Sequence, residues 1–264
     1  MSVLQQTRTK TRTRKRWSSK RLVRSVTIAP ADIVARDRTA PWLSQRPGLL
    51  LALWIVVGVL VVMHGLSVLV GERSWQLTRA FNLDRESNVP TWFSSGLWAL
   101  GAWAAWECAR LSGRARARRL WTVAAVGLLL LSCDEVAMLH ENLGNVLRHH
   151  GFAGRMLSFE DIPWPVAVPI LAVIVGWIAS SAQHMLKGSR HAQRRLMLAL
   201  VLLGVGAAGA DMLTDLLQPN LSTWALELMH LLEESLEMAG SLTVLSGLLW
   251  HQHWLLGPDA RRCA

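Results

Sequence analysis

Four residues of types that can carry protons or bind metals lie close together in the stretch SCDEVAMLHENLG, which begins at Ser132. Asp134 and Glu135 follow the apolar run LWTVAAVGLLLL, and His140 and Glu141 come shortly after them. Carboxylate and imidazole groups are ligands for divalent transition metals and also the usual general acids and bases. Because lipid does not solvate charge, acids at the end of an apolar helix need a partner or a function.

A second stretch, WALELMHLLEESLEMAGS, carries polar side chains along one side of an apolar helix. At about 100° per residue, these side chains fall within an arc of about 120°. They belong to Glu227, His230, Glu233, Glu234, Glu237 and Ser241. An ionised carboxylate at the centre of a lipid-facing helix costs about 2.5–3.5 kcal/mol, so this polar stripe is expected to face the inside of a helical bundle. Glu227 and His230 also form a Glu-x-x-His pair, a spacing that carboxylate-bridged di-metal bundles use.

Together the two stretches predict one carboxylate–histidine site in the outer half of a membrane. The predicted metal ligands are Asp134, Glu135, His140, Glu141, Glu227, His230 and Glu234. Residues expected to relay protons or to stand behind the ligands are Glu233, Glu237, Asp211, Asp215 and His64. A loop predicted at the outer mouth adds the oxygen-bearing side chains of Asp84, Glu86 and Asn88, for which helix capping and solvation are the alternative to cation binding.

Three interpretations of this site stay open. The first is a bound divalent metal or di-metal centre of iron, zinc or manganese. The second is a set of carboxylates that share protons without a metal, and the third is a purely structural hydrogen-bond network. The residue types alone assign no catalytic residue.

The elements that would position these residues are membrane-spanning helices. The chain is 52% hydrophobic, and its charged residues occur in blocks separated by long apolar stretches. These stretches predict an all-α, polytopic membrane bundle with about six spans, at residues 49–70, 92–111, 120–140, 164–186, 196–217 and 224–250. The predicted domains are a basic, disordered cytoplasmic tail (1–46), the six-helix transmembrane domain (47–257) and a short cytoplasmic tail (258–264).

The distribution of charge predicts the orientation. Most of the 28 Lys and Arg residues lie in the N-terminal tail, in RLSGRARARR, in KGSRHAQRR and in DARR, which fall on one side of a six-span protein. The positive-inside rule therefore places both termini in the cytoplasm. We interpret the basic N-terminal run as a topology signal or a contact for anionic lipid headgroups, rather than for nucleic acid, because no folded nucleic-acid-binding domain accompanies it.

Smaller features have simpler interpretations. The stretch LLGVGAAGA is typical of close helix packing. Asn88 and Pro90 are typical of a helix start. His251 and His253 are expected at the inner interface in contact with lipid headgroups, and the three cysteines show no metal or disulfide spacing.

The stretches FNLDRESNVPTWFSS, SCDEVAMLHE and EESLEMAG resemble a group of bacterial multi-pass membrane proteins to which no activity is assigned. The resemblance covers about residues 49 to 250 and leaves out the basic tail. The group has a serine-leucine-aspartate-glutamate pattern, and this chain has Cys133 in place of its leucine. The resemblance implies a six-span fold in the bacterial cytoplasmic (inner) membrane.

These features favour an integral membrane protein whose carboxylate–histidine site supports a metal-dependent reaction on a lipid or amphiphile. A proton- or cation-coupled transporter or channel is the first alternative, since acid-rich spans with few basic partners suit it equally well. No internal repeat supports that alternative. The second alternative is an accessory subunit of a larger membrane complex.

Overall fold

The computed structural model describes residues 47–70, 75–83, 87–138, 188–210 and 221–257, together with single residues between 173 and 186 and between 213 and 217. The chain divides into two units, Met1–Asp37 and Arg38–Ala264, and every described residue belongs to the second. The predicted tails, 1–46 and 258–264, lie outside the described residues.

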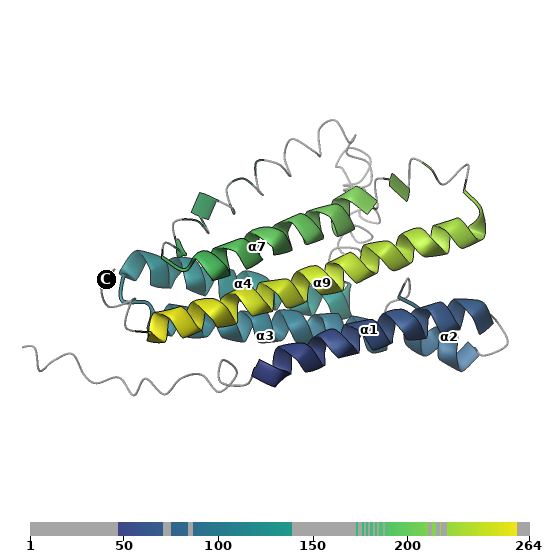
Figure 1. Ribbon diagram of the computed structural model, residues 1–264, viewed down its shortest axis with the longest axis horizontal. Helices are drawn as coiled ribbons and strands as arrows, with labels where there is room; N and C mark the ends of the chain where they lie inside the picture. Colours follow the sequence, from purple (N-terminus) through teal and green to yellow (C-terminus); the bar gives the residue numbers. More distant parts are fainter. Residues whose placement is uncertain are drawn as a thin grey trace, which may run out of the picture. The chain divides into compact units, whose positions relative to one another are not determined.

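The part of the chain that the structure describes forms helices and contains no strand, which confirms the all-α prediction. Figure 1 shows their arrangement. The elements are α1 (Pro47–Val70), α2 (Trp75–Phe81), α3 (Val89–Leu111), α4 (Ala115–Ala137), α7 (Arg190–Leu203), the π-helix η6 (Gly204–Ala210) and α9 (Thr223–Leu256). Two of them, at Gly48–Val70 and Ala115–Ala137, are long and apolar enough to cross a membrane by length and composition alone.

Helices occur at the predicted spans, but several boundaries differ. The helix expected at 120–140 begins earlier, at Ala115, and ends at Ala137. It ends there because Met138 takes a left-handed conformation, with φ 49°, and its N–H bonds back to the Asp134 carbonyl at 2.8 Å. The short helix α2 was not expected from the sequence. Of the span expected at 164–186, the described residues Val173 and Ile178 have helical backbone.

The start of α3 follows the prediction from Asn88 and Pro90. Asn88 is the N-cap, and its Oδ1 accepts hydrogen bonds from the Thr91 N–H at 3.1 Å and from the Thr91 hydroxyl at 3.0 Å. Asn88 Nδ2 donates to the Asn82 carbonyl, which fixes the end of the preceding segment against the helix start. Pro90 sits in the first turn, where its missing N–H is not needed.

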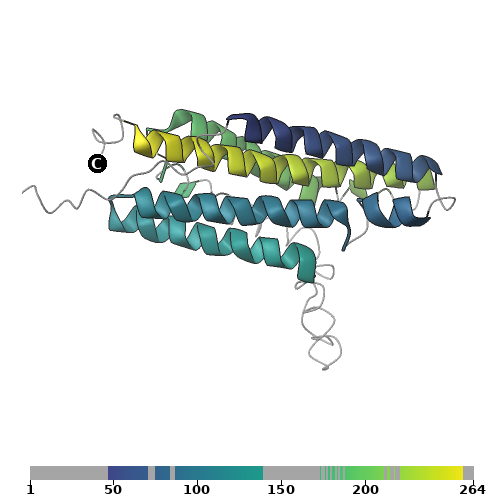
Figure 2. The ribbon, with the colours of Figure 1, turned by 90° about the horizontal axis from the view of Figure 1, so that it is seen from below.

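The described helices run in two opposite directions (Figures 1 and 2). α1, α4 and α7 run one way, whereas α3 and α9 run the other. α9 packs on α7, η6, α3 and α1, and α4 packs mainly on α3. α9 is therefore the central helix of the described part.

The packing of α7 and η6 on α9 depends on glycines, as the sequence predicts for LLGVGAAGA. A Cβ added at Gly206 would lie 3.1 Å from Leu236 Cβ, and one added at Gly240 would lie 2.6 Å from Leu203 Cγ. The helices approach this closely because glycine has no side chain at the contact.

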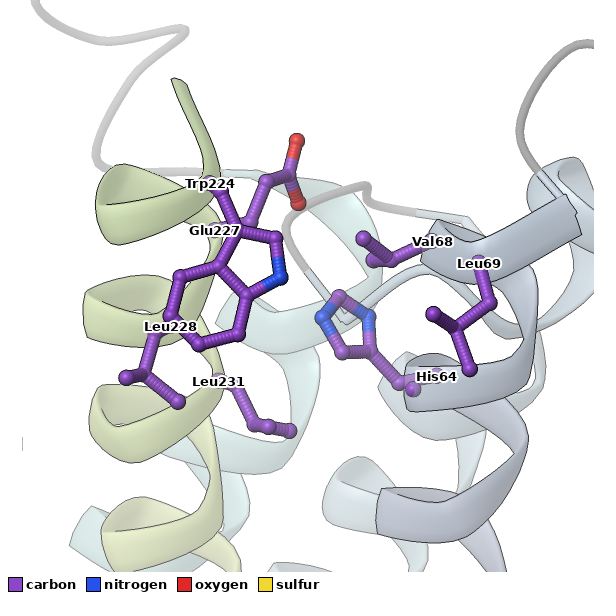
Figure 3. Close-up of a pocket in the computed structure, with 8 residues that line it drawn as sticks. His64, Val68, Leu69, Trp224, Glu227, Leu228 and Leu231 are labelled. Carbon is purple, nitrogen blue, oxygen red and sulfur yellow. The ribbon is translucent and has the colours of Figure 1, made fainter. Parts of the chain in front are cut away.

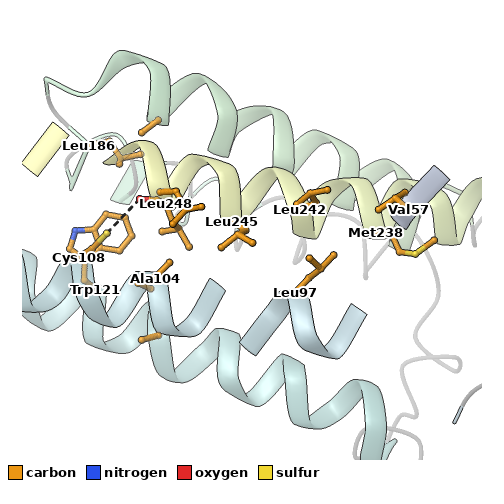
Figure 4. Close-up of a cluster of buried hydrophobic side chains, with 14 of the residues drawn as sticks. Val57, Leu97, Ala104, Cys108, Trp121, Leu186, Met238, Leu242, Leu245 and Leu248 are labelled. Carbon is orange, nitrogen blue, oxygen red and sulfur yellow. Dashed lines mark hydrogen bonds between the residues drawn. The ribbon is translucent and has the colours of Figure 1, made fainter. Parts of the chain in front are cut away.

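The core lies along the contact between α3 and α9 (Figure 4). Leu97 and Ala104 of α3 pack with Leu242, Leu245 and Leu248 of α9, and all five side chains are buried. The Gln252 amide donates to the Ala104 carbonyl at 2.7 Å, and the Cys108 thiol lies 3.9 Å from the Leu248 carbonyl. These contacts fix the register of the two parallel helices at one end of the core.

Candidate functional site between α1 and α9

A groove of about 220 Å³ lies between the C-terminal half of α1 and the first turns of α9. Its lining is mostly apolar and includes two ionisable side chains, His64 of α1 and Glu227 of α9. Figure 3 shows the His64 imidazole pointing across the groove toward Trp224 and Glu227. The lining residues are His64, Gly65, Val68, Leu69, Trp224, Glu227, Leu228 and Leu231.

His64 is fully buried, and the backbone around it fixes its orientation. The Leu83 N–H donates to His64 Nδ1 at 2.9 Å, and the Ser67 hydroxyl donates to the His64 carbonyl at 2.8 Å. A ring nitrogen that accepts a hydrogen bond carries no proton, so the neutral imidazole has its proton on Nε2. His64 therefore presents an N–H donor on the side of the ring away from Leu83.

Glu227 supplies an acid to the lining of the same groove. It lies near the start of α9, which Ser222 caps by accepting a hydrogen bond from the Ala225 N–H at 3.4 Å. Glu227 Oε2 is buried and makes no hydrogen bond with any part of the chain that the structure describes. A buried carboxyl oxygen without a donor is costly, so this atom is suited to receive a hydrogen bond from a bound group.

The rest of the polar stripe on α9 contacts other neighbours. His230 Nδ1 lies 3.9 Å from Glu233 Oε2, whereas Glu227 lines the groove toward α1. The Glu237 side chain packs against η6, since its Cγ lies 3.2 Å from the position of a Cβ on Gly206. Glu233, Glu234 and Glu237 are half-buried. The arc predicted from the sequence thus spans two environments, one facing α1 and one facing η6.

Glu135 of α4 belongs to a polar contact between α3 and α4. Ser95 and Ser132 are buried and exchange hydrogen bonds: each hydroxyl donates to the other's carbonyl, at 2.8 and 2.9 Å. Glu135 lies three residues after Ser132 on α4, and its Oε1 accepts a hydrogen bond from Trp98 Nε1 of α3 at 3.1 Å. The structure therefore gives Glu135 a partner on α3, and that partner is an indole.

Several predicted site residues lie outside the described residues, so the metal interpretation stays a prediction. These residues are His140, Glu141, Asp84, Glu86, Asp211 and Asp215. Among the residues that are described, no three His, Cys, Asp or Glu side chains gather as metal ligands. Asn88, of the predicted outer loop, uses its side-chain oxygen to cap α3.

The expectation that His251 contacts lipid headgroups is wrong. His251 is buried, and its ring lies 5.1 Å from that of Trp121 and 5.6 Å from that of Trp254, measured between ring centroids. His253 is exposed. The sequence places both histidines at the same end of the helix, but it does not show that α4 covers one of them through Trp121.

The sequence prediction includes both His64 and Glu227 in one site, but it does not show that they line the same groove. The two residues are far apart in the chain, and only the packing of α1 on α9 brings them together. The sequence feature that points to a role for His64 is that it is the sole ionisable residue in the apolar helix α1.

Comparison with known proteins gives one match. A model of a domain of unknown function (DUF8692) matches residues 49–252, which include every described helix apart from a few end residues of α1 and α9. Comparisons with curated proteins and with solved structures find no match.

Proposed function

This chain belongs to the DUF8692 family, and we propose that it is an integral membrane protein that binds the polar group of a lipid or other amphiphile between α1 and α9. The observation that carries this proposal is that His64 and Glu227 face one apolar groove between these helices. A donor and an acid in apolar surroundings suit a ligand with a polar head and an apolar tail.

The exposed surfaces of the helices support a location in lipid. Side chains of α1 such as Ile55, Val62 and Leu69 are 58%, 61% and 79% exposed, and on α4 Val123 and Leu130 are 65% and 59% exposed. Soluble proteins rarely expose apolar patches of this extent. A bilayer would cover both helices, and the groove would then open sideways into it.

The two ends of the described helices differ in charge, which supports the predicted orientation. The end of α3 and the starts of α4 and α7 lie at one end (Figure 1). Its basic residues are Arg110, Arg114, Arg116, Arg118, Arg119, Arg190, Arg194 and Arg195. The acids at the start of α9 and the end of α4 lie toward the opposite end. By the positive-inside rule, the basic end is cytoplasmic and the groove opens in the outer half of the bilayer.

We expect reporter proteins inserted at Gly113 and fused after Ala264 to report the cytoplasm. A reporter inserted at Ser87 should report the opposite side, because α3 would cross the bilayer between Ser87 and Gly113. The measurement is the activity of paired reporters that work only inside or only outside the cytoplasm. Identical reports from Gly113 and Ser87 would show that α3 does not span.

The chemistry proposed for the groove follows from its two polar groups. The His64 Nε2–H donates to an oxygen of the ligand's head, and Glu227 accepts from a hydroxyl, amine or water on the same ligand. If the protein is an enzyme, these groups are placed to move a proton to and from the head while the apolar lining excludes bulk water. A metal would supply a Lewis acid or a bound water if the predicted ligand set forms, and it would involve the acids of the polar stripe on α9.

Ligand entry can be tested with a photoreactive phospholipid in nanodiscs that contain the purified full-length chain. Leu231→Trp should fill the groove and remove most crosslinks to α1 and α9. Leu232→Trp is the matched control, since Leu232 is 49% exposed and does not line the groove. Glu227→Gln should weaken binding by about tenfold, because a hydrogen bond to a charged group contributes about 1.5–3 kcal/mol. Equal crosslinking in Leu231→Trp and Leu232→Trp would refute the proposal.

A proton- or cation-conducting role is the second candidate. It is favoured by the half-buried acids Glu233, Glu234 and Glu237, which follow one another along α9 beside the π-helix η6. Metal analysis of the purified protein, together with proton flux into liposomes, separates this role from lipid binding. A proton flux that falls in Glu237→Gln and persists in Leu231→Trp would favour the conducting role.

A further inference from the structure

A cluster of basic and aromatic side chains lies at the basic end, where the start of α7 packs on the end of α9. The Arg195 guanidinium lies 4.9 Å from the centroid of the Trp250 ring, and Arg195 Nη1 also donates to the Ser246 hydroxyl. His191 and His253 approach the same indole, with ring centroids 5.5 Å and 6.5 Å away. The Trp250 indole is thus surrounded by Arg195, His191 and His253.

The described segments that form this cluster, 188–210 and 238–257, carry no carboxylate to balance its charge. The sequence contains no Asp or Glu between residues 188 and 210 or between residues 238 and 257. In the part of the chain that the structure describes, no ion pair is formed by Arg190, Arg194 or Arg195. Arg195 has five N–H donors in a planar fork, and the bond to Ser246 uses one of them. Its remaining donors are suited to an oxyanion, which a guanidinium binds through two parallel hydrogen bonds.

An exposed apolar stripe leads away from the cluster along α7. Arg194, Leu198, Val201 and Val205 follow at spacings of four, three and four residues, so they share one face of the helix. Leu198, Val201 and Val205 are 52%, 58% and 51% exposed. Trp250, which contacts Arg195 at the start of α7, is 40% exposed, as is typical of an indole at a membrane interface. Charge at one end and an apolar stripe below it match the two parts of a phospholipid.

We infer that Arg195, Trp250 and the start of α7 form a binding site for the phosphate of an anionic phospholipid in the cytoplasmic leaflet. The acyl chains lie along Leu198 and Val201, and the phosphate binds the guanidinium of Arg195, which Ser246 and Trp250 hold in place. The positive end of the α7 dipole adds to the attraction. This site rests on the proposal that the helices span a bilayer, but it does not depend on the groove between α1 and α9.

The test measures how much phosphatidylglycerol and phosphatidylcholine the purified full-length protein retains, by mass spectrometry of the intact protein released from nanodiscs. The unmodified protein should retain phosphatidylglycerol preferentially. Arg195→Gln should lower that retention about tenfold, because it removes the charge-assisted hydrogen bonds between the guanidinium and the phosphate. Arg118→Gln is the matched control, because it removes one exposed positive charge from α4 at the same end. Its retention should stay within the error of the unmodified protein.

Other outcomes would overturn the inference. Equal losses in Arg195→Gln and Arg118→Gln would mean that only the general charge of this end attracts the lipid. Complete displacement of phosphatidylglycerol by inorganic phosphate would assign the cluster to a soluble anion. If Arg195→Gln does not fold, Ser246→Ala keeps the charge, and it should still lower retention because the guanidinium loses its anchor. Leu231→Trp, which blocks the groove, should retain phosphatidylglycerol normally, so the two proposals can fail separately.

Discussion

Replacing Gly247 by Leu is expected to destabilise the folded protein by about 3 kcal/mol or more. A Cβ at this position would lie 2.7 Å from Leu196 Cγ and 3.4 Å from the Ala192 carbonyl, so a leucine here requires Leu196 to change its position and α7 to move away from α9. The displacement separates two helices that form part of one core. The measurement is the thermal midpoint of purified protein in detergent, together with the fraction that elutes as a single species.

Gly127→Leu is the control for this change. Gly127 also lies within a helix, but a Cβ added there meets no atom within 4 Å. A leucine at this exposed position should leave the thermal midpoint unchanged or slightly raised, since glycine is a poor helix former. If Gly247→Leu unfolded at the same temperature as Gly127→Leu, the close contact between α7 and α9 would be wrong.

Replacing His64 by Phe is expected to raise the hydrogen-exchange rate of the Leu83 amide by about tenfold to a hundredfold. The phenyl ring fills the space of the imidazole but cannot accept the hydrogen bond that the Leu83 N–H makes to Nδ1 at 2.9 Å. Both residues are buried, and a buried donor without an acceptor costs about 1–3 kcal/mol. Local opening then becomes easier by the same free energy.

Leu66→Phe serves as the control because Leu66 is 44% exposed on the same helix. It should leave the exchange of Leu83 unchanged. A Leu83 amide that stays equally protected in His64→Phe would show that His64 does not tie α1 to the segment before α3. The exchange measurement does not depend on any ligand, so it tests the architecture of the groove separately from its proposed function.

The sequence predicts α1, α3, α4 and α9 because each contains a long apolar stretch, whereas the seven-residue α2 has none. It predicts the start of α3 because Asn88 and Pro90 act locally, through the cap and the first turn. It does not predict the π-helix η6. A π-helix closes i→i+5 hydrogen bonds in place of the i→i+4 bonds of an α-helix, and the change here coincides with the close approach of Gly206 to α9. The sequence also does not predict the end of α4 at Ala137. Methionine rarely adopts a positive φ, yet Met138 does so here.

The candidate site is predicted in its residue types but only partly in its geometry. The spacing of Glu227 to Glu237 correctly places these residues on one side of α9. An arc of about 120° is wide enough to touch more than one neighbour, however. Which neighbour each acid meets depends on the order of the helices around α9, and the sequence does not encode this order locally. The same reason explains why Glu135 meets Trp98 and why His64 meets Glu227.

The length and continuity of α9 have a mechanical consequence. The helix runs without interruption from Thr223 to Leu256, and Glu227 and Trp250 lie about 35 Å apart along it at about 1.5 Å per residue. A helix of this kind behaves as a stiff rod, so a piston-like displacement at one end appears at the other with little loss. A molecule that pulls on Trp250 would therefore shift Glu227 relative to His64, and the two ends of α9 would respond together.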